Sequence, residues 1–218
     1  PRLKEIVTSL ATHLHAFVRE TGLTHAEWNT GIQLLEQAGE ISDKERHEMV
    51  LFSDLLGISS LVDMVNMVPE GTSSSVLGPF HIADAPPIAF GHDMKRHYGG
   101  EVLLATGVVR DLNGAPISGA EIDIWQTAPN GLYSSQDAEQ DTYSFHGIQT
   151  VGADGRYGFT TVKPVSYEVP TDGPGGEMLR ATGRHAWRPS HLHFIVKAPG
   201  HRTLVSEIFA DGDPYLDQ

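Results

Sequence analysis

The chain has 218 residues, no cysteine and a formal net charge of −13 at pH 7. This length suffices for one domain with a sizeable core, or for a β-domain with a helical appendage. The excess of acidic residues argues against nucleic acid and anionic membranes as partners, and the lack of cysteine excludes a disulfide framework. No apolar run is long enough to insert into a membrane, so we expect a soluble cytoplasmic protein.

Helical signals dominate the first part of the chain. Apolar residues recur there at spacings of three and four, which is typical of an amphipathic helix. These residues are Leu3, Ile6, Val7, Leu10, Leu14 and Phe17. Two capping-box patterns follow, Thr24 with Glu27 and Ser42 with Glu45, and each predicts the start of a helix. We expect three helices and a shorter fourth one at 58–68.

The pattern changes after the loop expected at 71–87, which is rich in serine, glycine and proline. Short apolar or alternating runs then lie between turn signals, among which Asn113-Gly114 and Asp154-Gly155 predict hairpin-type turns. The expected strands are 102–110, 122–126, 157–162, 192–197 and 203–209. Regularly punctuated short strands favour an antiparallel β-sandwich. We therefore predict a mainly β protein with a helical N-terminal part, divided into residues 1–95 and 96–218.

Two histidines stand two residues apart at the start of an apolar run. A strand turns alternate side chains to the same face, so His191 and His193 would point one way while Leu192 and Phe194 point the other. Two neutral imidazoles side by side form half of a metal site, and zinc is the first guess from histidines alone. A pair of ordinary buried, hydrogen-bonded histidines is an equally good interpretation of these two residues.

Two tyrosines lie in segments typical of functional loops. Tyr133 follows a glycine turn, and Tyr167 lies between Pro164 and Pro170, which stiffen the backbone around it. Each tyrosine alone is best interpreted as an ordinary amphipathic core or surface residue.

Taken together, these segments resemble the intradiol ring-cleavage dioxygenases, non-haem Fe(III) enzymes that open catechol-type rings between the two hydroxyls. The resemblance covers most of the chain in ordered blocks. The blocks are 108–111, 114–120, 123–126, 131–134, 171–174, 183–194 and 212–215. It implies a β-sandwich that carries the active site, with Tyr133, Tyr167, His191 and His193 as the four protein ligands of one ferric ion. Fe(III) is a hard cation that can deprotonate a bound phenol, and two tyrosinates with one hydroxide would balance its charge.

The resemblance also implies roles for residues around the iron. Tyr167 would leave the metal when a substrate diol chelates it, and would then accept a phenolic proton. Arg188 would lie beside the substrate ring, although a surface salt bridge is the plain alternative. Glu207 stands where catechol-cleaving relatives commonly have glutamine. It would either accept a hydrogen bond from an extra substrate hydroxyl or pair with Arg188.

The segment 72–81 resembles hydroxyquinol-cleaving members of the family more than plain catechol enzymes. The substrate-pocket residues implied by the resemblance are Leu51, Asp54, Leu55, Val76, Leu77, Gly78 and Phe80, together with Glu207. Asp54 is the polar exception among apolar residues, and its carboxylate would bind a third ring hydroxyl. We therefore predict cleavage of hydroxyquinol by O2 to maleylacetate. Alternatives are cleavage of catechol or chlorocatechol to cis,cis-muconates, or a non-enzymatic β-sandwich binding or carrier domain.

The resemblance further implies a homodimer formed through the N-terminal helices, with phospholipid bound at the interface as an added expectation. Alternatively, the helices pack over the sandwich and cover its sheet edges. The family usually continues beyond the block 212–215, so we expect the chain to be truncated at its C-terminus. The other histidines, His81 and His146 among them, form no evident group and are expected to be solvated or hydrogen-bonded.

Overall fold

The computed structural model describes residues 1–217 and begins with helices. They are α1 (Arg2–Thr21), α2 (His25–Glu40), α3 (Glu48–Leu55) and α4 (Ile58–Asn66). The first predicted capping box is confirmed: the Thr24 hydroxyl accepts the Glu27 N–H, and the Glu27 carboxylate accepts the Thr24 N–H. The second is wrong. The Ser42 hydroxyl donates to the Ala38 carbonyl, the Asp43 carboxylate forms a turn, and α3 starts only at Glu48.

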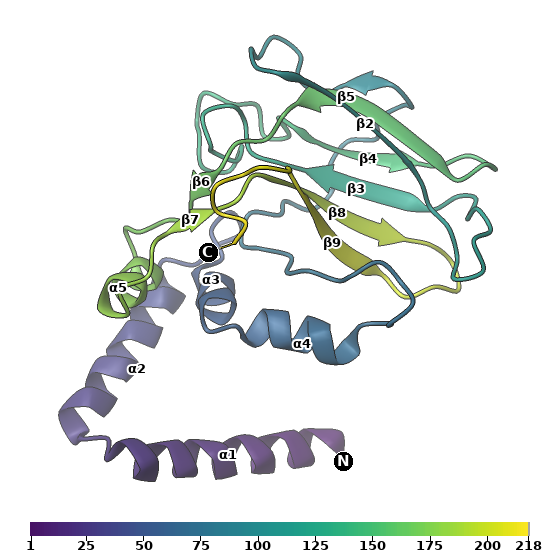
Figure 1. Cartoon of the computed structure of the whole chain (residues 1–218). Helices are drawn as coiled ribbons and strands as arrows, with labels where there is room; N and C mark the ends of the chain where they lie inside the picture. The colour runs from purple at the N-terminus through teal and green to yellow at the C-terminus, as the bar shows by residue number, and fades with distance from the viewer. Residues whose placement is uncertain (218) are drawn as a thin grey trace.

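The predicted antiparallel sandwich is confirmed (Figure 1). Its strands are β1 (His92–Asp93), β2 (Val102–Val108), β3 (Glu121–Trp125), β4 (His146–Thr150), β5 (Arg156–Val162), β8 (His191–Lys197) and β9 (Leu204–Phe209). One sheet has the order β1-β5-β2 and the other β4-β3-β8-β9, while β6 (Tyr167–Glu168) and β7 (Trp187–Arg188) form a separate pair. Pairing is antiparallel except between β1 and β5.

Five elements were not predicted, namely the two-residue strands β1, β6 and β7, the strand β4 and the helix α5. The strand β4 carries little alternation, and α5 (Pro174–Ala181) contains two glycines that disfavour a helix on propensity alone. The turn at Asp154-Gly155 joins β4 to β5, which lie in different sheets, so it is not the expected hairpin.

The four-stranded sheet has two differently used faces. Ile122, Ile124 and Phe194 point inward and pack against Phe159 of the other sheet. The opposite face carries Trp125 and Ile195, which pack with the helices: a second buried cluster joins these two residues to Leu51 of α3 and Leu179 of α5. Alternation along β3 and β8 therefore places His193, opposite Trp125, on the face covered by helices.

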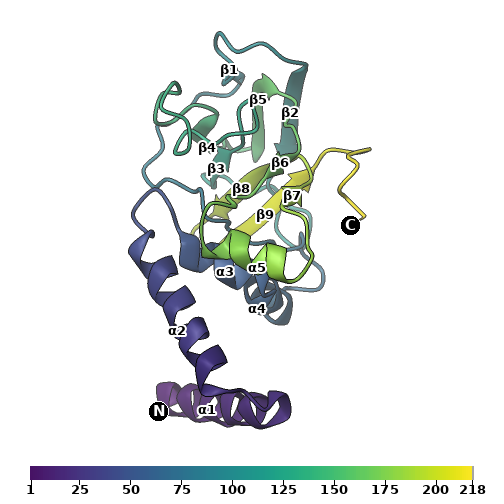
Figure 2. The same cartoon turned by 90° about the vertical axis from the view of Figure 1, so that its left-hand side faces the viewer.

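Helices α1 and α2 extend away from the sandwich as an arm (Figure 2). No residue of α1 is buried, and its apolar positions, including Leu10 and Phe17, are exposed. In this structure α1 therefore covers no sheet edge, whereas α3 packs on the four-stranded sheet through Leu51. None of the helices within residues 1–217 is long and apolar enough to cross a membrane.

Candidate metal centre

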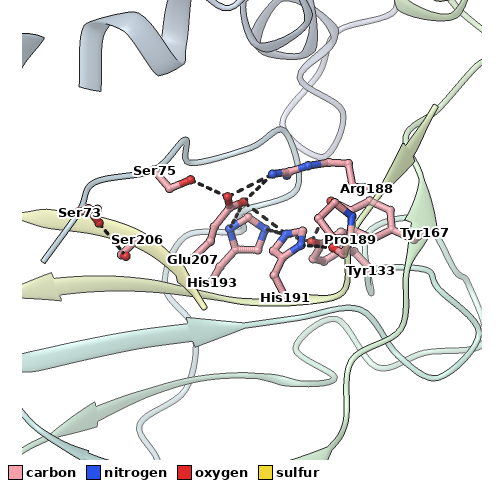
Figure 3. Close-up of polar contacts among 10 residues, drawn as sticks. All are labelled: Ser73, Ser75, Tyr133, Tyr167, Arg188, Pro189, His191, His193, Ser206 and Glu207. Carbon is pink, nitrogen blue, oxygen red and sulfur yellow. Dashed lines mark hydrogen bonds and ion pairs between the residues drawn. The ribbon is translucent and has the colours of Figure 1, made fainter. Parts of the chain in front are cut away.

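Two phenols and two imidazoles converge on one point (Figure 3). The Tyr133 hydroxyl lies 3.2 Å from the Tyr167 hydroxyl and 3.0 Å from His193 Nε2. His191 Nε2 lies 3.0 Å from His193 Nε2. All four residues are buried, and they come from the loop after β3, from β6 and from β8. The structure thus brings together the four residues that the resemblance implied.

Ring packing holds this group in place. The His193 imidazole lies parallel to the Trp125 ring at a centroid distance of 4.6 Å, and Phe80 stacks on Tyr133 at 4.7 Å. Gly78 adopts φ 74°, and a Cβ there would lie 3.4 Å from His193 Cε1. Because the rings are packed from several sides, their donor atoms have little freedom to turn away.

Burial determines the charge state of these groups before a cation binds. Burial lowers the pKa of His191 to about 4 and lowers the pKa of His193 well below its usual value. Burial likewise raises the pKa of Tyr133 well above its usual value, and the neighbouring Tyr167 adds to the rise. At neutral pH the imidazoles are therefore uncharged and have lone pairs to offer, while the phenols need a bound cation to ionise.

A backbone carbonyl orients one of the two imidazoles. His191 Nδ1 lies 2.7 Å from the carbonyl oxygen of Pro189, to which it donates when its proton is on that nitrogen. This contact leaves His191 Nε2 without a proton, at 3.0 Å from His193 Nε2.

Arg188 and Glu207 form an ion pair beside the group rather than a surface salt bridge. Arg188 Nη2 lies 3.0 and 3.1 Å from the two carboxylate oxygens of Glu207, and the Ser75 hydroxyl donates to Oε2 of the same carboxylate. The Glu207 side chain is 1 % exposed. Arg188 stands opposite Tyr167 in the β6–β7 pair, and its charge opposes the rise that burial produces in the pKa of Tyr167.

A cavity of about 530 Å³ opens beside Tyr167 and Arg188. Four residues expected at the substrate pocket line it, namely Leu51, Asp54, Leu55 and Val76. Asp54 Oδ1 is buried there without a hydrogen-bond partner, and burial raises the pKa of this carboxyl. The cavity thus combines apolar walls, two arginines, Arg184 and Arg188, and one unsatisfied carboxylate oxygen.

The other expected pocket residues are not among those lining this cavity. Gly78 lies against the His193 ring, Phe80 against Tyr133, and Leu77 is 40 % exposed. Glu207 is directed towards Arg188 and the imidazoles.

A second polar group, which no sequence pattern predicted, lies next to the first. His81 Nε2 and His146 Nε2 lie 2.9 and 2.7 Å from the two oxygens of Asp123. The Trp125 ring lies between this group and His193, with centroid distances of 4.7 Å to His81 and 4.6 Å to His193. These three residues come from a loop, β4 and β3, and only the β3–β4 register and the path of the loop bring them together.

The sequence is similar to those of known proteins along its whole length. The sequence profile described as "Catechol dioxygenase N terminus" matches residues 1–72, and the one described as "Dioxygenase" matches residues 78–218. The chain belongs to the intradiol ring-cleavage dioxygenase family. It is 46 % identical to the 6-chlorohydroxyquinol 1,2-dioxygenase of Cupriavidus pinatubonensis, over 99 % of the chain and 79 % of the relative. It is also 46 % identical to the hydroxyquinol 1,2-dioxygenase of Rhizobium sp., over 99 % of the chain and 74 % of the relative.

Solved structures of this dioxygenase family have the same fold. The hydroxyquinol 1,2-dioxygenase from Pseudomonas putida DLL-E4 superimposes with a TM-score of 0.87 and 47 % identity, over all of this chain and 77 % of the other. The catechol 1,2-dioxygenase from Acinetobacter sp. ADP1 gives 0.84 and 29 %, over 99 % and 72 %. The protein is therefore an intradiol ring-cleavage dioxygenase acting on aromatic diols or triols, and the non-enzymatic carrier alternative is wrong.

Intradiol dioxygenases use non-haem iron, and the donor atoms described above fit this ion. The two phenols, once deprotonated, are hard anionic oxygen donors, and the two neutral imidazoles are borderline nitrogen donors. Neighbouring donor atoms lie 3.0 to 3.2 Å apart. No thiolate is present in the sequence to favour a softer metal.

Proposed function

We propose that this dioxygenase cleaves hydroxyquinol, 1,2,4-trihydroxybenzene, with O2 to give maleylacetate, on a ferric ion held by Tyr133, Tyr167, His191 and His193. The observation that carries the substrate assignment is the buried, unpartnered Oδ1 of Asp54 on the cavity wall. A third ring hydroxyl would supply the missing donor, and catechol has no such group. The names of the relatives at 46 and 47 % identity support the same choice.

The four donors would give the ion two negative charges and two neutral ligands. When bound, the iron supplies Lewis acidity, because it withdraws electron density from a chelated diol and so promotes its reaction with O2. The protein's own contribution to this chemistry is to keep both imidazoles neutral and to exclude water from the tyrosines through burial.

Tyr167 is the ligand best placed to take up a substrate proton. It touches the donor group through its hydroxyl and also lines the 530 Å³ cavity, whereas Tyr133 is not among the residues that line it. Burial raises the pKa of Tyr167, so its phenolate, once released by the metal, would be a strong base. Arg188 lines the same cavity and would stabilise negative charge that develops on the ring.

The cavity walls would fix the ring and recognise its extra hydroxyl. Leu51, Leu55 and Val76 offer apolar surface to an aromatic ring, and Asp54 would accept the hydrogen bond of the third hydroxyl. A buried acceptor left unpaired destabilises a bound substrate, so a site built around Asp54 discriminates against catechol.

Two measurements test this function. Iron-loaded protein should absorb visible light, because tyrosinate bound to Fe(III) has a charge-transfer band, and it should consume O2 faster with hydroxyquinol than with catechol or chlorocatechol. If catechol is turned over faster than hydroxyquinol, hydroxyquinol is not the preferred substrate and the catechol alternative takes its place. A colourless protein after iron loading would refute the proposed ligand set.

We further propose that residues 1–95 form a dimerisation and linker region and that residues 96–218 form the catalytic part. The exposed apolar face of α1 supports pairing with a second copy, because such a face needs a cover in water. Phospholipid is a second candidate cover at this interface. Sedimentation analysis should give twice the chain mass, and Leu10→Glu with Leu14→Glu should give monomers. Lipid extraction followed by mass spectrometry tests the phospholipid.

A further inference from the structure

Glu207 is a buried carboxylate directly beside the predicted metal ligands. It stands opposite His193 in the β8–β9 register, so the two side chains share one face of the sheet. The same row continues across the sheet: Trp125 of β3 stands opposite His193, and His146 of β4 stands opposite Trp125. The position of Glu207 is thus fixed by strand pairing and not by a mobile loop.

The two oxygens of Glu207 have different surroundings. Oε2 receives the Ser75 hydroxyl at 2.5 Å and Arg188 Nη2 at 3.1 Å. Oε1 receives Arg188 Nη2 at 3.0 Å and lies 3.3 Å from His191 Nε2 and 3.4 Å from His193 Nδ1 (Figure 3). One oxygen is therefore anchored by protein donors, while the other faces both imidazoles.

The imidazole of His193 lacks a hydrogen bond on the side opposite the donor group. Its Nε2 lies 3.0 Å from both the Tyr133 hydroxyl and His191 Nε2, whereas its Nδ1 is buried and has no hydrogen-bond partner. An imidazole that binds a metal through Nε2 carries its proton on Nδ1, and this proton normally has an acceptor. For His191 the acceptor is the Pro189 carbonyl, and for His193 the structure offers Glu207 Oε1.

We propose that Glu207 is a positioning residue of the iron centre, which accepts a hydrogen bond from the Nδ1–H of His193 and adds one negative charge beside the ion. This inference rests on the proposed function, since it presupposes iron bound at His191 and His193. A carboxylate acceptor makes the imidazole a stronger electron donor than a carbonyl acceptor does. The same carboxylate holds the Arg188 guanidinium through contacts to both of its oxygens.

The charge has a definite consequence for the iron. Two tyrosinates, Glu207 and Arg188 together contribute a net charge of −2, and replacing Glu207 by glutamine would reduce this to −1. The iron would then be more electron-poor, so less energy would be needed to move an electron from tyrosinate to iron. The charge-transfer band would move to longer wavelength, and the ion would be bound less tightly.

The test compares full-length wild type, Glu207→Gln and Ser75→Ala after loading with Fe(III). We expect Glu207→Gln to absorb at longer wavelength than wild type and to release iron to a chelator with an affinity lower by roughly 10- to 100-fold. Ser75→Ala is the matched control. It removes a contact to the anchored oxygen and keeps the charge, so its band should stay at the wild-type position. A Glu207→Gln band and iron affinity equal to those of wild type would overturn the inference.

A second measurement needs no substitution and decides the case if Glu207→Gln does not fold. Wild type loaded with diamagnetic Ga(III) allows NMR detection of ring protons and nitrogens. We expect a slowly exchanging proton on Nδ1 of His193 that resonates at lower field than the Nδ1 proton of His191, because a carboxylate acceptor forms a stronger hydrogen bond than a carbonyl does. Equal chemical shifts for the two protons would overturn the inference. Failure of the ligand set itself is a separate outcome, since wild type would then remain colourless with iron.

Discussion

Replacing Asp54 measures how much of the substrate preference resides in one side chain. Asp54 lines the cavity with its Oδ1 unpartnered, and Leu51, Leu55 and Val76 surround it with apolar groups. A hydrogen bond to a charged acceptor in such surroundings contributes about 1.5–3 kcal/mol. Asp54→Ala should therefore lower kcat/KM for hydroxyquinol by roughly 10- to 150-fold. Catechol lacks the third hydroxyl that forms this bond, so its kcat/KM should fall much less.

The assay is oxygen uptake with both substrates across a range of concentrations. Asp54→Asn keeps the shape and one acceptor but removes the charge, so its loss with hydroxyquinol should fall between wild type and Asp54→Ala. Asp141→Ala is the matched control, because Asp141 is exposed, pairs with Arg96 and does not line the cavity. Equal losses for hydroxyquinol and catechol in Asp54→Ala would show that Asp54 supports the fold of the pocket and does not select the substrate.

Three further predictions concern stability and the metal. Burial raises the pKa of Asp123, but hydrogen bonds from His146 and His81 outweigh this rise and hold the pKa at about 2, below the ordinary 3.8. The lowered pKa stabilises the fold by about 2 kcal/mol above pH 4, and this stabilisation is lost as the pH falls towards 2. Asp123→Asn should therefore be less stable than wild type in urea at pH 6. A difference in unfolding free energy that stays the same in acid would contradict this. Gly78 has φ 74°, and a Cβ there would lie 3.4 Å from His193 Cε1. Because an alanine is strained at this φ, Gly78→Ala should lower the unfolding free energy by about 1–2 kcal/mol, and an unchanged melting curve would contradict this. Chelation should abolish both colour and oxygen uptake, with Fe(III) but not Zn(II) restoring them; recovery with zinc would exclude the proposed ligand chemistry.

Local pattern was enough to predict the half of the site that lies on one strand. His191 and His193 alternate with apolar residues, and a period of two places both imidazoles on one face without any knowledge of the rest of the chain. Tyr133 and Tyr167 are different, because their glycine and proline neighbours indicate loops but do not distinguish a metal ligand from an ordinary tyrosine. They could be assigned only through the ordered blocks shared with the intradiol dioxygenases.

The remaining parts of the site depend on how distant segments meet. His81, Asp123 and His146 come together through the β3–β4 register and the path of a loop, and neither is encoded near these residues. The contact of Glu207 with His193 likewise depends on the β8–β9 register, where a shift by one residue would turn Glu207 to the other face. Helix α5 was missed for another reason: tertiary packing of Leu179 overrides the poor helix propensity of its glycines.

The imidazoles and the phenols of the site lie on segments that differ in how firmly strand pairing holds them. His191 and His193 belong to β8, which is paired on both sides within the four-stranded sheet, whereas Tyr133 lies in a loop and Tyr167 in a two-residue strand. Partial opening of a native protein begins in segments with few such pairings. Hydrogen exchange at the tyrosines should therefore precede exchange in β8, and gentle denaturation should bleach the protein while its sheet is still intact.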